Sequence, residues 1–271
     1  MRCKDTRVVE RLYSDFEEAK KLGHKVLGVF LQGSQNYNLD YEGSDIDTKC
    51  VVLPSFEDIC LNKKMVSTTH VIETGEHLDL KDVRDMIHNF KKQNINFLEI
   101  LFTDYYVLSP TYYDLWMELV KHREEIARYN VVTNMRATSG MCYEKFKALC
   151  KDTPSQHEEI VKYGWATKQL HHCKRLREFA ERYSNGESFA ECLISRDYED
   201  LVAIKSRGHE IYTLEEAVAL ADKYQTASLA ICKEFESKFE GKDVINKKAE
   251  QLMTDTVIAI LRKTLKKDIM G

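Results

Sequence analysis

The sequence predicts an α+β protein, with a small mixed sheet in an α/β head and a helical bundle as its body. Residues 1–110 alternate helical hydrophobic spacing with short apolar runs, whereas residues 111–271 follow helical spacing almost throughout. The chain of 271 residues contains only 11 Gly and 3 Pro, so helix-breaking residues are scarce. Its 43% of hydrophobic residues suffices for a substantial core, which excludes a disordered or fibrous protein. We therefore expect an α/β domain at residues 1–110 and a helical domain at residues 111–271.

The head is expected to begin with a helix and two strands. Residues 6–22 carry apolar side chains at helical spacing, which predicts an amphipathic helix. Residues 25–31 are apolar and rich in valine and aromatic side chains, as in a buried strand. A polar loop at residues 32–43 then leads to a second strand at residues 44–53.

The remaining segments complete the head and form the body. Two further strands are predicted at residues 65–72 and 76–81, with Thr74-Gly75 between them as a hairpin turn. Helical spacing resumes at Val83. The helices expected in the body lie near residues 112–128, 131–151, 157–183, 197–206, 213–239 and 243–267.

Charge, cysteine content and hydropathy restrict the class of protein. A formal charge of −4 argues against a protein that coats nucleic acid by bulk charge. The 8 cysteines include no Cys-x-x-Cys pair and no Cys/His cluster with the spacing of a structural zinc site. Because no signal peptide follows Met1, we expect free thiols and a cytoplasmic location. The apolar runs are too short to cross a bilayer, so no membrane partner is expected.

Two aspartates and a glycine-serine pair are the most informative residues of the head. Gly33-Ser34 follows the first predicted strand, and Asp45-Ile46-Asp47 opens the second. Residues two apart on a strand share a face, so both carboxylates should project together while Ile46 enters the core. Such a pair repels unless a divalent cation compensates it, and oxygen ligands suit Mg²⁺. A glycine followed by a serine lets backbone amides and a hydroxyl approach an anion. These are the parts that a nucleoside triphosphate site with its metals requires.

The aspartate pair has a simpler interpretation when it is taken alone. With 18 Asp in the chain, an Asp-x-Asp triplet is expected about once by chance, so the pair by itself indicates a solvated edge strand. The complete order is harder to obtain by accident. It comprises a strand, Gly33-Ser34, a polar loop and a strand that opens with Ser44-Asp45-Ile46-Asp47.

This order resembles the signature of the DNA polymerase β-type nucleotidyltransferase superfamily. The finer similarity is to its predicted bacterial and phage nucleotidyltransferases, which read Gly-Ser-His-Ala-Tyr-Gly and then Ser-Asp-x-Asp-x-Arg-Gly-Val. The chain keeps Tyr37, whereas Gln35 replaces the histidine and Lys49 replaces the arginine. The resemblance implies a nucleotidyltransferase head in which Gly33, Ser34, Tyr37 and Lys49 bind the nucleotide.

The resemblance also implies a third carboxylate on a later strand. Asp79 fits best, because it lies on a predicted strand directly before a helix. Asp82 and Asp85 are the alternatives, and Asp82 also suits a helix cap. Residues 94–99 resemble an Asn-Pro-Asn-x-x-Glu motif of the same proteins, in which capping by Asn96 is the simplest role.

A basic helix in the body carries a second block of the resemblance. Lys168, His172 and Arg175 fall within about 60° of one another on a helical wheel, and periodicity alone favours a solvated helix face. The family has Gly-Tyr-x-x-Lys-x-Ala-x-His-x-x-Arg on a helix, and residues 164–175 retain its lysine, histidine and arginine. The resemblance implies that these cations bind the triphosphate or the departing pyrophosphate.

The activity implied by the resemblance is nucleotidyl transfer. Asp45, Asp47 and Asp79 would hold two Mg²⁺ ions, or Mn²⁺, and a nucleoside monophosphate would pass from a triphosphate, ATP by default, to a hydroxyl. An RNA end, a protein hydroxyl and a small molecule are all compatible acceptors. Two other interpretations stay open at this point. One is a non-catalytic nucleotide sensor or partner-binding module on the same fold, and the other is a helical scaffold with a purely structural head.

Overall fold

The computed structural model describes residues 5–37, 39–41, 44–72 and 75–270. The chain forms two compact units. The first, which we call the sheet unit, comprises residues 1–36, 43–129 and 245–271, and the second, the helical unit, comprises residues 37–42 and 130–244. The predicted fold class is confirmed, since a mixed five-stranded sheet is followed by a helical body. The predicted boundary near residue 110 lies inside the sheet unit.

The sheet unit is built on five strands in the order β3-β4-β2-β1-β5. β2 and β4 pair in parallel, while the other neighbours pair antiparallel. β5 was not predicted, because its three residues are too few to show a periodicity. The strand bounds are β1 Lys25–Gln32, β2 Asp47–Leu53, β3 Ser67–Val71, β4 His77–Asp82 and β5 Tyr106–Leu108.

The beginning of β2 differs from the prediction. We expected a strand from Ser44, but the ladder with β1 ends where Gln32 pairs with Asp47. Beyond Gln32 the chain turns at Gly33, so residues 44–46 have no neighbouring strand and stay outside β2. In the other predicted turn, Gly75 has a positive φ, while Thr74 lies outside the described residues.

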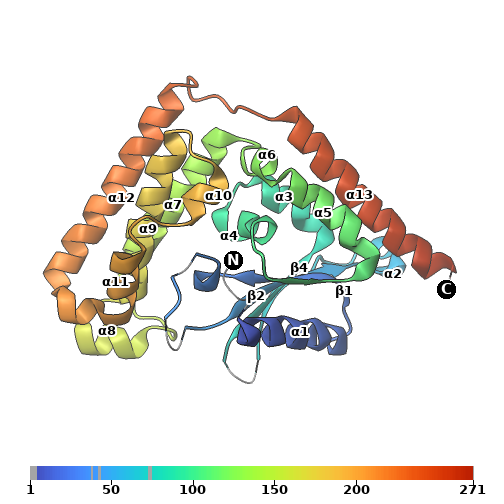
Figure 1. Ribbon diagram of the computed structural model, residues 1–271, viewed down its shortest axis with the longest axis horizontal. Helices are drawn as coiled ribbons and strands as arrows, with labels where there is room; N and C mark the ends of the chain where they lie inside the picture. The colour runs from blue at the N-terminus through green and yellow to red at the C-terminus, as the bar shows by residue number, and fades with distance from the viewer. Residues whose placement is uncertain (1–4, 38, 42–43, 73–74, 271) are drawn as a thin grey trace. The chain divides into compact units, whose positions relative to one another are not determined.

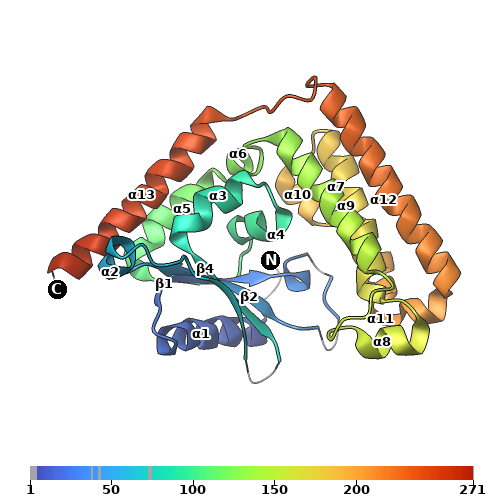
Figure 2. The ribbon, with the colours of Figure 1, turned by 180° about the vertical axis from the view of Figure 1, so that it is seen from behind.

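Helices cover both faces of this sheet (Figure 1 and Figure 2). The helix α1, Thr6–Lys21, lies on one side, and α3, α4 and α5 lie on the other. The core under α1 contains Val8 and Leu12 of the helix together with sheet residues such as Cys50 and Leu80. The helices of the unit after α1 are α2 Phe56–Cys60, α3 Met86–Lys91, α4 Ile95–Leu98, α5 Tyr113–Lys121, α6 Arg123–Ala127 and α13 Lys247–Met270.

The last helix, α13, belongs to the sheet unit, although its residues were predicted within the helical domain. The hydroxyl of Tyr112 lies 2.9 Å from that of Thr264 inside the unit. Near the other end of α13, Lys91 Nζ lies 2.7 Å from Glu250 Oε1. These long-range contacts cannot be read from the helical spacing of the C-terminal residues.

The helical unit contains six helices among the described residues, and α9 contacts α7, α10, α11 and α12. We predicted one continuous helix over residues 157–183, but the chain divides it at Gly164. Gly164 has a φ of +80°, a left-handed conformation that ends a helix and favours glycine. The bounds are α7 Val131–Ala148, α8 His157–Tyr163, α9 Thr167–Ser184, α10 Phe189–Leu193, α11 Tyr198–Ile211 and α12 Leu214–Ser237.

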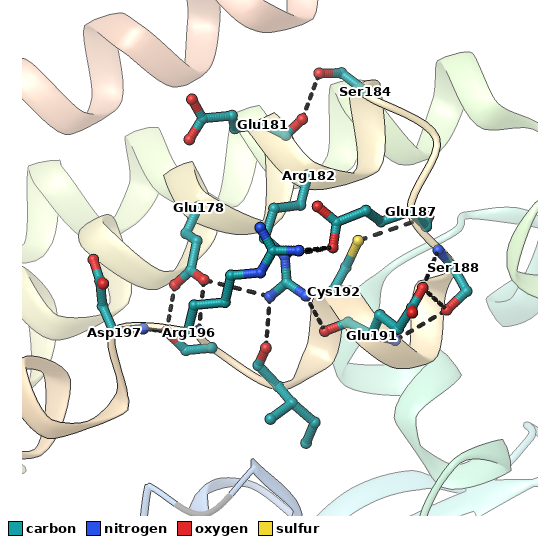
Figure 3. A network of polar contacts seen from close by, with 12 residues as sticks. Glu178, Glu181, Arg182, Ser184, Glu187, Ser188, Glu191, Cys192, Arg196 and Asp197 are labelled. Atoms are coloured by element: carbon teal, nitrogen blue, oxygen red, sulfur yellow. Dashed lines mark hydrogen bonds and ion pairs between the residues drawn. The ribbon is translucent and has the colours of Figure 1, made fainter.

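Arg182 at the end of α9 holds the following segment in place (Figure 3). Its guanidinium is buried and donates to Glu187 Oε2 at 2.9 Å. It also donates to the backbone carbonyls of Ile194 at 2.6 Å and Glu191 at 2.8 Å. The Arg182 guanidinium is therefore used in hydrogen bonds within the protein, and it does not extend the basic face of the helix.

Each of the 7 cysteines in the described part of the chain is free, and 5 of them are buried. Across the residues that the structure describes, no helix has both the length and the apolar character that a membrane crossing requires.

Candidate functional site

A glycine turn follows β1 directly. Gly33 has a φ of +80°, a conformation that side-chain-bearing residues adopt at a cost. The turn is held by Asn36, whose Nδ2 donates to the carbonyl of Leu31 at 2.9 Å. Thr103 Oγ1 in turn donates to Asn36 Oδ1 at 2.7 Å. We call Gly33-Ser34 the glycine corner.

The fold brings the glycine corner next to the predicted aspartates. The register of β1 and β2 pairs Gln32, the residue before the corner, with Asp47. Gln35, just after the corner, donates its Nε2 hydrogen to the backbone carbonyl of Asp45 at 2.7 Å. We call residues 45–47 the acidic segment. The corner and the acidic segment therefore lie next to each other in the sheet unit.

The two aspartates differ in their surroundings. The exposed carboxylate of Asp45 forms no hydrogen bond or ion pair with any described residue. Asp47 Oδ1 lies 3.4 Å from the backbone nitrogen of His77 and 3.4 Å from its ring Nδ1. Because Asp45 precedes β2, the strand alternation that we invoked for the pair does not apply to it. Ile46 packs against the hydrophobic core as predicted.

Asp79 lies on β4 and is engaged by two lysines. The parallel register pairs it with Lys49 of β2, and Lys49 Nζ lies 2.6 Å from Asp79 Oδ2. Lys81 Nζ lies 3.2 Å from the other oxygen, Oδ1. Asp79 and Asp47 share a sheet face, because Lys49 is two residues from Asp47 and lies opposite Asp79.

Lys49 was predicted to bind nucleotide, but its ammonium group forms an ion pair with Asp79. Only 5% of its side chain is exposed. Burial lowers the pKa of Lys49, and the charge of Asp79 and its hydrogen bond oppose that shift.

Within the described parts of the chain, no group of three or more His, Cys, Asp or Glu side chains is arranged to hold a metal ion.

The alternatives to Asp79 have structural roles. The side chain of Asp82 caps the turn after β4 by accepting from Arg84 N at 2.8 Å, as its helix-cap interpretation predicted. It also forms a 2.6 Å ion pair with Arg84 Nη2. Asp85 accepts a hydrogen bond from Asn89 at 2.8 Å.

Glu99 is a site residue to which the sequence analysis gave no role. Its side chain is buried, and its Oε2 lies 3.5 Å from the backbone nitrogen of Gly33. Its sequence signal was the resemblance of residues 94–99 to the Asn-Pro-Asn-x-x-Glu motif. The cap of α4 is Asn94, which accepts from Asn96 N at 2.9 Å, so the capping role expected for Asn96 was wrong.

The predicted cations lie on α9 in the helical unit. Lys168 is exposed and His172 is half-buried. The guanidinium carbon of Arg175 lies 3.8 Å from the ring centre of Tyr37. The buried Tyr37 hydroxyl has no hydrogen-bond partner among the described residues. Burial, with the positive charges around it, holds the pKa of His172 well below its usual value, so this ring is neutral at pH 7.

Lys145 of α7 joins these cations and was missed in the sequence. Burial and the neighbouring charge of Lys168 lower the pKa of Lys145. It lies three residues after Cys142, whose Sγ is 3.5 Å from the carbonyl of Cys173 on α9. Only the packing of α7 on α9 reveals this lysine, because the two helices are separate in sequence.

Two other basic residues of α9, Lys174 and His171, interact with α11 or the residue before it. Lys174 forms ion pairs with Asp200 and Asp197. His171 is buried, and its Nδ1 lies 2.9 Å from the carbonyl of Leu201. Burial lowers the pKa of His171 to about 3. His171 therefore has a structural role in the packing of α9.

No protein-family model matches the chain, and no curated protein matches it. Among solved structures, the chain is similar to a nucleotidyltransferase-like protein from Exiguobacterium sibiricum, with 13% sequence identity and a TM-score of 0.28. The similarity covers 84% of this chain and 74% of that one. A similarity at this level does not establish a family.

The chemistry of the site follows from its side chains. Asp45 and Asp47 offer carboxylate oxygens, the donors that Mg²⁺ and Mn²⁺ prefer. The neighbouring glycine corner leaves room beside its backbone, since a Cβ at Gly33 would meet no atom within 4 Å. These donor types suit a divalent cation with a bound anion, whereas both carboxylate oxygens of Asp79 are engaged by Lys49 and Lys81.

Proposed function

We propose that this protein is a Mg²⁺-dependent nucleotidyltransferase. It would move a nucleoside monophosphate from a triphosphate, ATP by default, to a hydroxyl acceptor and release pyrophosphate. The observation that supports this proposal best is the pairing of Gln32 with Asp47, which puts the glycine corner beside the acidic segment. The hydrogen bond from Gln35 to the Asp45 carbonyl supports the same arrangement.

The carboxylates have distinct roles in the proposal. Asp45 and Asp47 would hold the metal, and Asp79 would serve as the third carboxylate if its partners Lys49 and Lys81 moved away from it. A bound divalent cation would lower the pKa of the acceptor hydroxyl and offset the charge of the leaving pyrophosphate. Positioning and charge compensation then suffice, and no covalent intermediate with a side chain is needed.

The remaining predicted residues bind phosphate and nucleotide in the proposal. Gly33 and Ser34 would line the triphosphate, with the Ser34 hydroxyl as a donor, while the Gly33 N–H faces Glu99 Oε2. The resemblance assigns phosphate binding to Lys168 and Arg175, which lie on α9 of the helical unit. His172 donates a hydrogen bond as a neutral ring, because its lowered pKa leaves it uncharged. The Tyr37 hydroxyl, buried without a partner in the described residues, is a further donor.

The acceptor is described by its chemistry only. An RNA end, a protein hydroxyl and a small-molecule hydroxyl each supply the required nucleophile. The net charge of −4 disfavours a long duplex as the substrate, whereas a nucleic-acid end requires only a local basic patch.

One observation favours a second candidate, a non-catalytic nucleotide-binding module. The ion pair between Lys49 and Asp79 gives the third carboxylate a counter-charge from the protein itself. A site that keeps this pair when nucleotide is bound would present only two metal-binding carboxylates. Such a site would bind triphosphate without transferring it.

Label transfer distinguishes the two candidates. The protein is incubated with Mg²⁺ and each α-³²P-labelled nucleoside triphosphate, and total RNA, cell protein and a small-molecule extract are offered as separate acceptors. We expect label on one acceptor class and release of unlabelled pyrophosphate. Tight triphosphate binding with no label on any acceptor would favour the non-catalytic module.

The control variants are matched in charge. Asp45→Asn/Asp47→Asn removes both carboxylates of the acidic segment. Asp222→Asn/Asp255→Asn removes two exposed carboxylates on α12 and α13, each of which contacts only a glutamine of its own helix in the described residues. The proposal requires that only the first variant lose labelling. Equal labelling by both variants would eliminate the site.

A further inference from the structure

A buried ion network lies beneath the acidic segment, on the α1 side of the sheet. Arg11 and Asp15 of α1 are both buried, with 7% and 1% of their side chains exposed. Arg11 Nε donates to Asp15 Oδ2 at 2.8 Å. Arg11 Nη1 forms an ion pair with Glu76, which directly precedes β4. Buried Arg11 and Asp15 thus join the partly buried Glu76, which comes from a distant part of the chain.

The network contacts the chain on both sides of Asp47. Glu76 Oε1 accepts the backbone N–H of Ile46 at 2.8 Å. Asp15 accepts the hydroxyl hydrogen of Thr48, the residue after Asp47. Residues 46 and 48 are therefore held from the α1 side.

The contact at Ile46 is unusual for its position. Residues 44–46 lie outside β2 and lack the strand ladder that orders the residues after them. The Glu76 carboxylate takes the place of a neighbouring strand by accepting the Ile46 amide. It fixes the peptide between the two carboxylates that the proposed function assigns to the metal.

We propose that Glu76 and Asp15, joined by Arg11, are positioning residues that hold the acidic segment in its metal-binding conformation. This inference rests on the proposed function, since it assigns the segment to metal binding. None of the three side chains needs to touch metal or substrate. They act through the backbone of Ile46 and the side chain of Thr48, and residues of this kind typically alter metal affinity by 10- to 100-fold.

Manganese titration of the full-length protein, followed by the electron paramagnetic resonance signal of free Mn²⁺, measures this effect. We expect Glu76→Ala to weaken Mn²⁺ binding by about tenfold or more. Glu76→Gln retains an oxygen that accepts the Ile46 N–H, so it should stay within about threefold of the wild type. Glu10→Ala, which removes the same charge from an exposed position on α1, should leave the affinity unchanged.

Amide hydrogen exchange at Ile46 tests the contact without any metal. The Ile46 N–H should be protected in the wild type and in Glu76→Gln, and should exchange at least tenfold faster in Glu76→Ala. A wild-type Ile46 amide that exchanges like an exposed loop amide would overturn the inference. Equal Mn²⁺ affinity of Glu76→Ala and the wild type would overturn it as well.

The two proposals fail in different ways. A wild-type protein that binds no Mn²⁺ contradicts the proposed function, and the positioning role then falls with it even if Ile46 is protected. A wild type that binds Mn²⁺ through Asp45 and Asp47 while Glu76→Ala binds equally well contradicts only the positioning role.

Discussion

The ammonium nitrogen of Lys49 lies 2.6 Å from a carboxylate oxygen of Asp79, across the parallel pair of β2 and β4. Only 5% of the Lys49 side chain and 19% of the Asp79 side chain are exposed, so the pair is largely removed from water. Lys81 lies 3.2 Å from the second oxygen of Asp79. Asp79, which the sequence analysis chose as the third metal ligand, is therefore held in an ion pair with Lys49.

A double-mutant cycle on this pair should reveal strong coupling. Lys49→Met leaves a mostly buried carboxylate with Lys81 alone, and should lower the free energy of unfolding by about 3 kcal/mol. Asp79→Leu leaves a buried ammonium and should cost a similar amount. The double variant should be less destabilised than the two single variants together, since no buried charge is left unpaired. Urea unfolding at pH 7 measures all three, and strict additivity would mean that the pair is not formed.

The aspartates of the acidic segment should have opposite effects on stability with and without metal. In EDTA, the free energy of unfolding of Asp45→Asn/Asp47→Asn should equal that of the wild type or exceed it by about 0.5 kcal/mol, because two neighbouring negative charges are removed. In excess Mg²⁺ the order should reverse, because only the wild type gains binding energy from the ion. Thermal unfolding in the two buffers gives the comparison. An identical response of both proteins to Mg²⁺ would exclude these carboxylates as its ligands.

Gly33 and Gly140 form a matched pair of glycine positions. A Cβ at either would meet no atom within 4 Å, so steric contact does not distinguish them. Gly33 has a φ of +80°, and Gly33→Ala should cost about 1–2 kcal/mol of stability and weaken triphosphate binding at the corner. Gly140 lies inside α7, where an alanine should stabilise by about 0.5–1 kcal/mol. Chemical unfolding and a fluorescent triphosphate titration provide both readouts, and a neutral Gly33→Ala would contradict the role of the turn.

The lowered pKa of His171 should make the folded protein less stable in mild acid. Its pKa in the folded protein is about 3, below the ordinary value of 6.5, because the ring is buried. Between these values the unfolded chain binds a proton that the folded chain does not, so stability falls as the pH drops below about 6.5. The contribution of one such group approaches about 1.4 kcal/mol per pH unit.

The control for this effect is His171→Asn. Its amide can donate to the Leu201 carbonyl as His171 Nδ1 does, but it does not titrate. Unfolding measured at pH 7.5, 6.5 and 5.5 should show a shallower decline for the variant than for the wild type. Parallel profiles would mean that His171 is protonated to the same extent in the folded and unfolded states.

Several parts of the fold follow from local sequence alone. The amphipathic spacing at residues 6–22 correctly predicted α1, and the apolar run at residues 25–31 correctly predicted β1. Both signals arise from periodicity within one element, which reflects the face that the element buries. The order of strand, glycine corner and acidic segment was also visible in the sequence, because it occupies 23 consecutive residues, 25–47.

Only the tertiary structure decided which groups meet. The pairing of β2 with β4 sets Lys49 opposite Asp79, and the pairing of β1 with β2 ends the ladder at Asp47. Lys145 approaches the cations of α9 only because α7 packs against that helix. Strand register and helix packing depend on residues far apart in the chain, and a periodic pattern within one segment carries no information about its partner. The residue types of the site could therefore be predicted from the sequence. Their ion-pair partners depend on long-range packing, which only the tertiary structure shows.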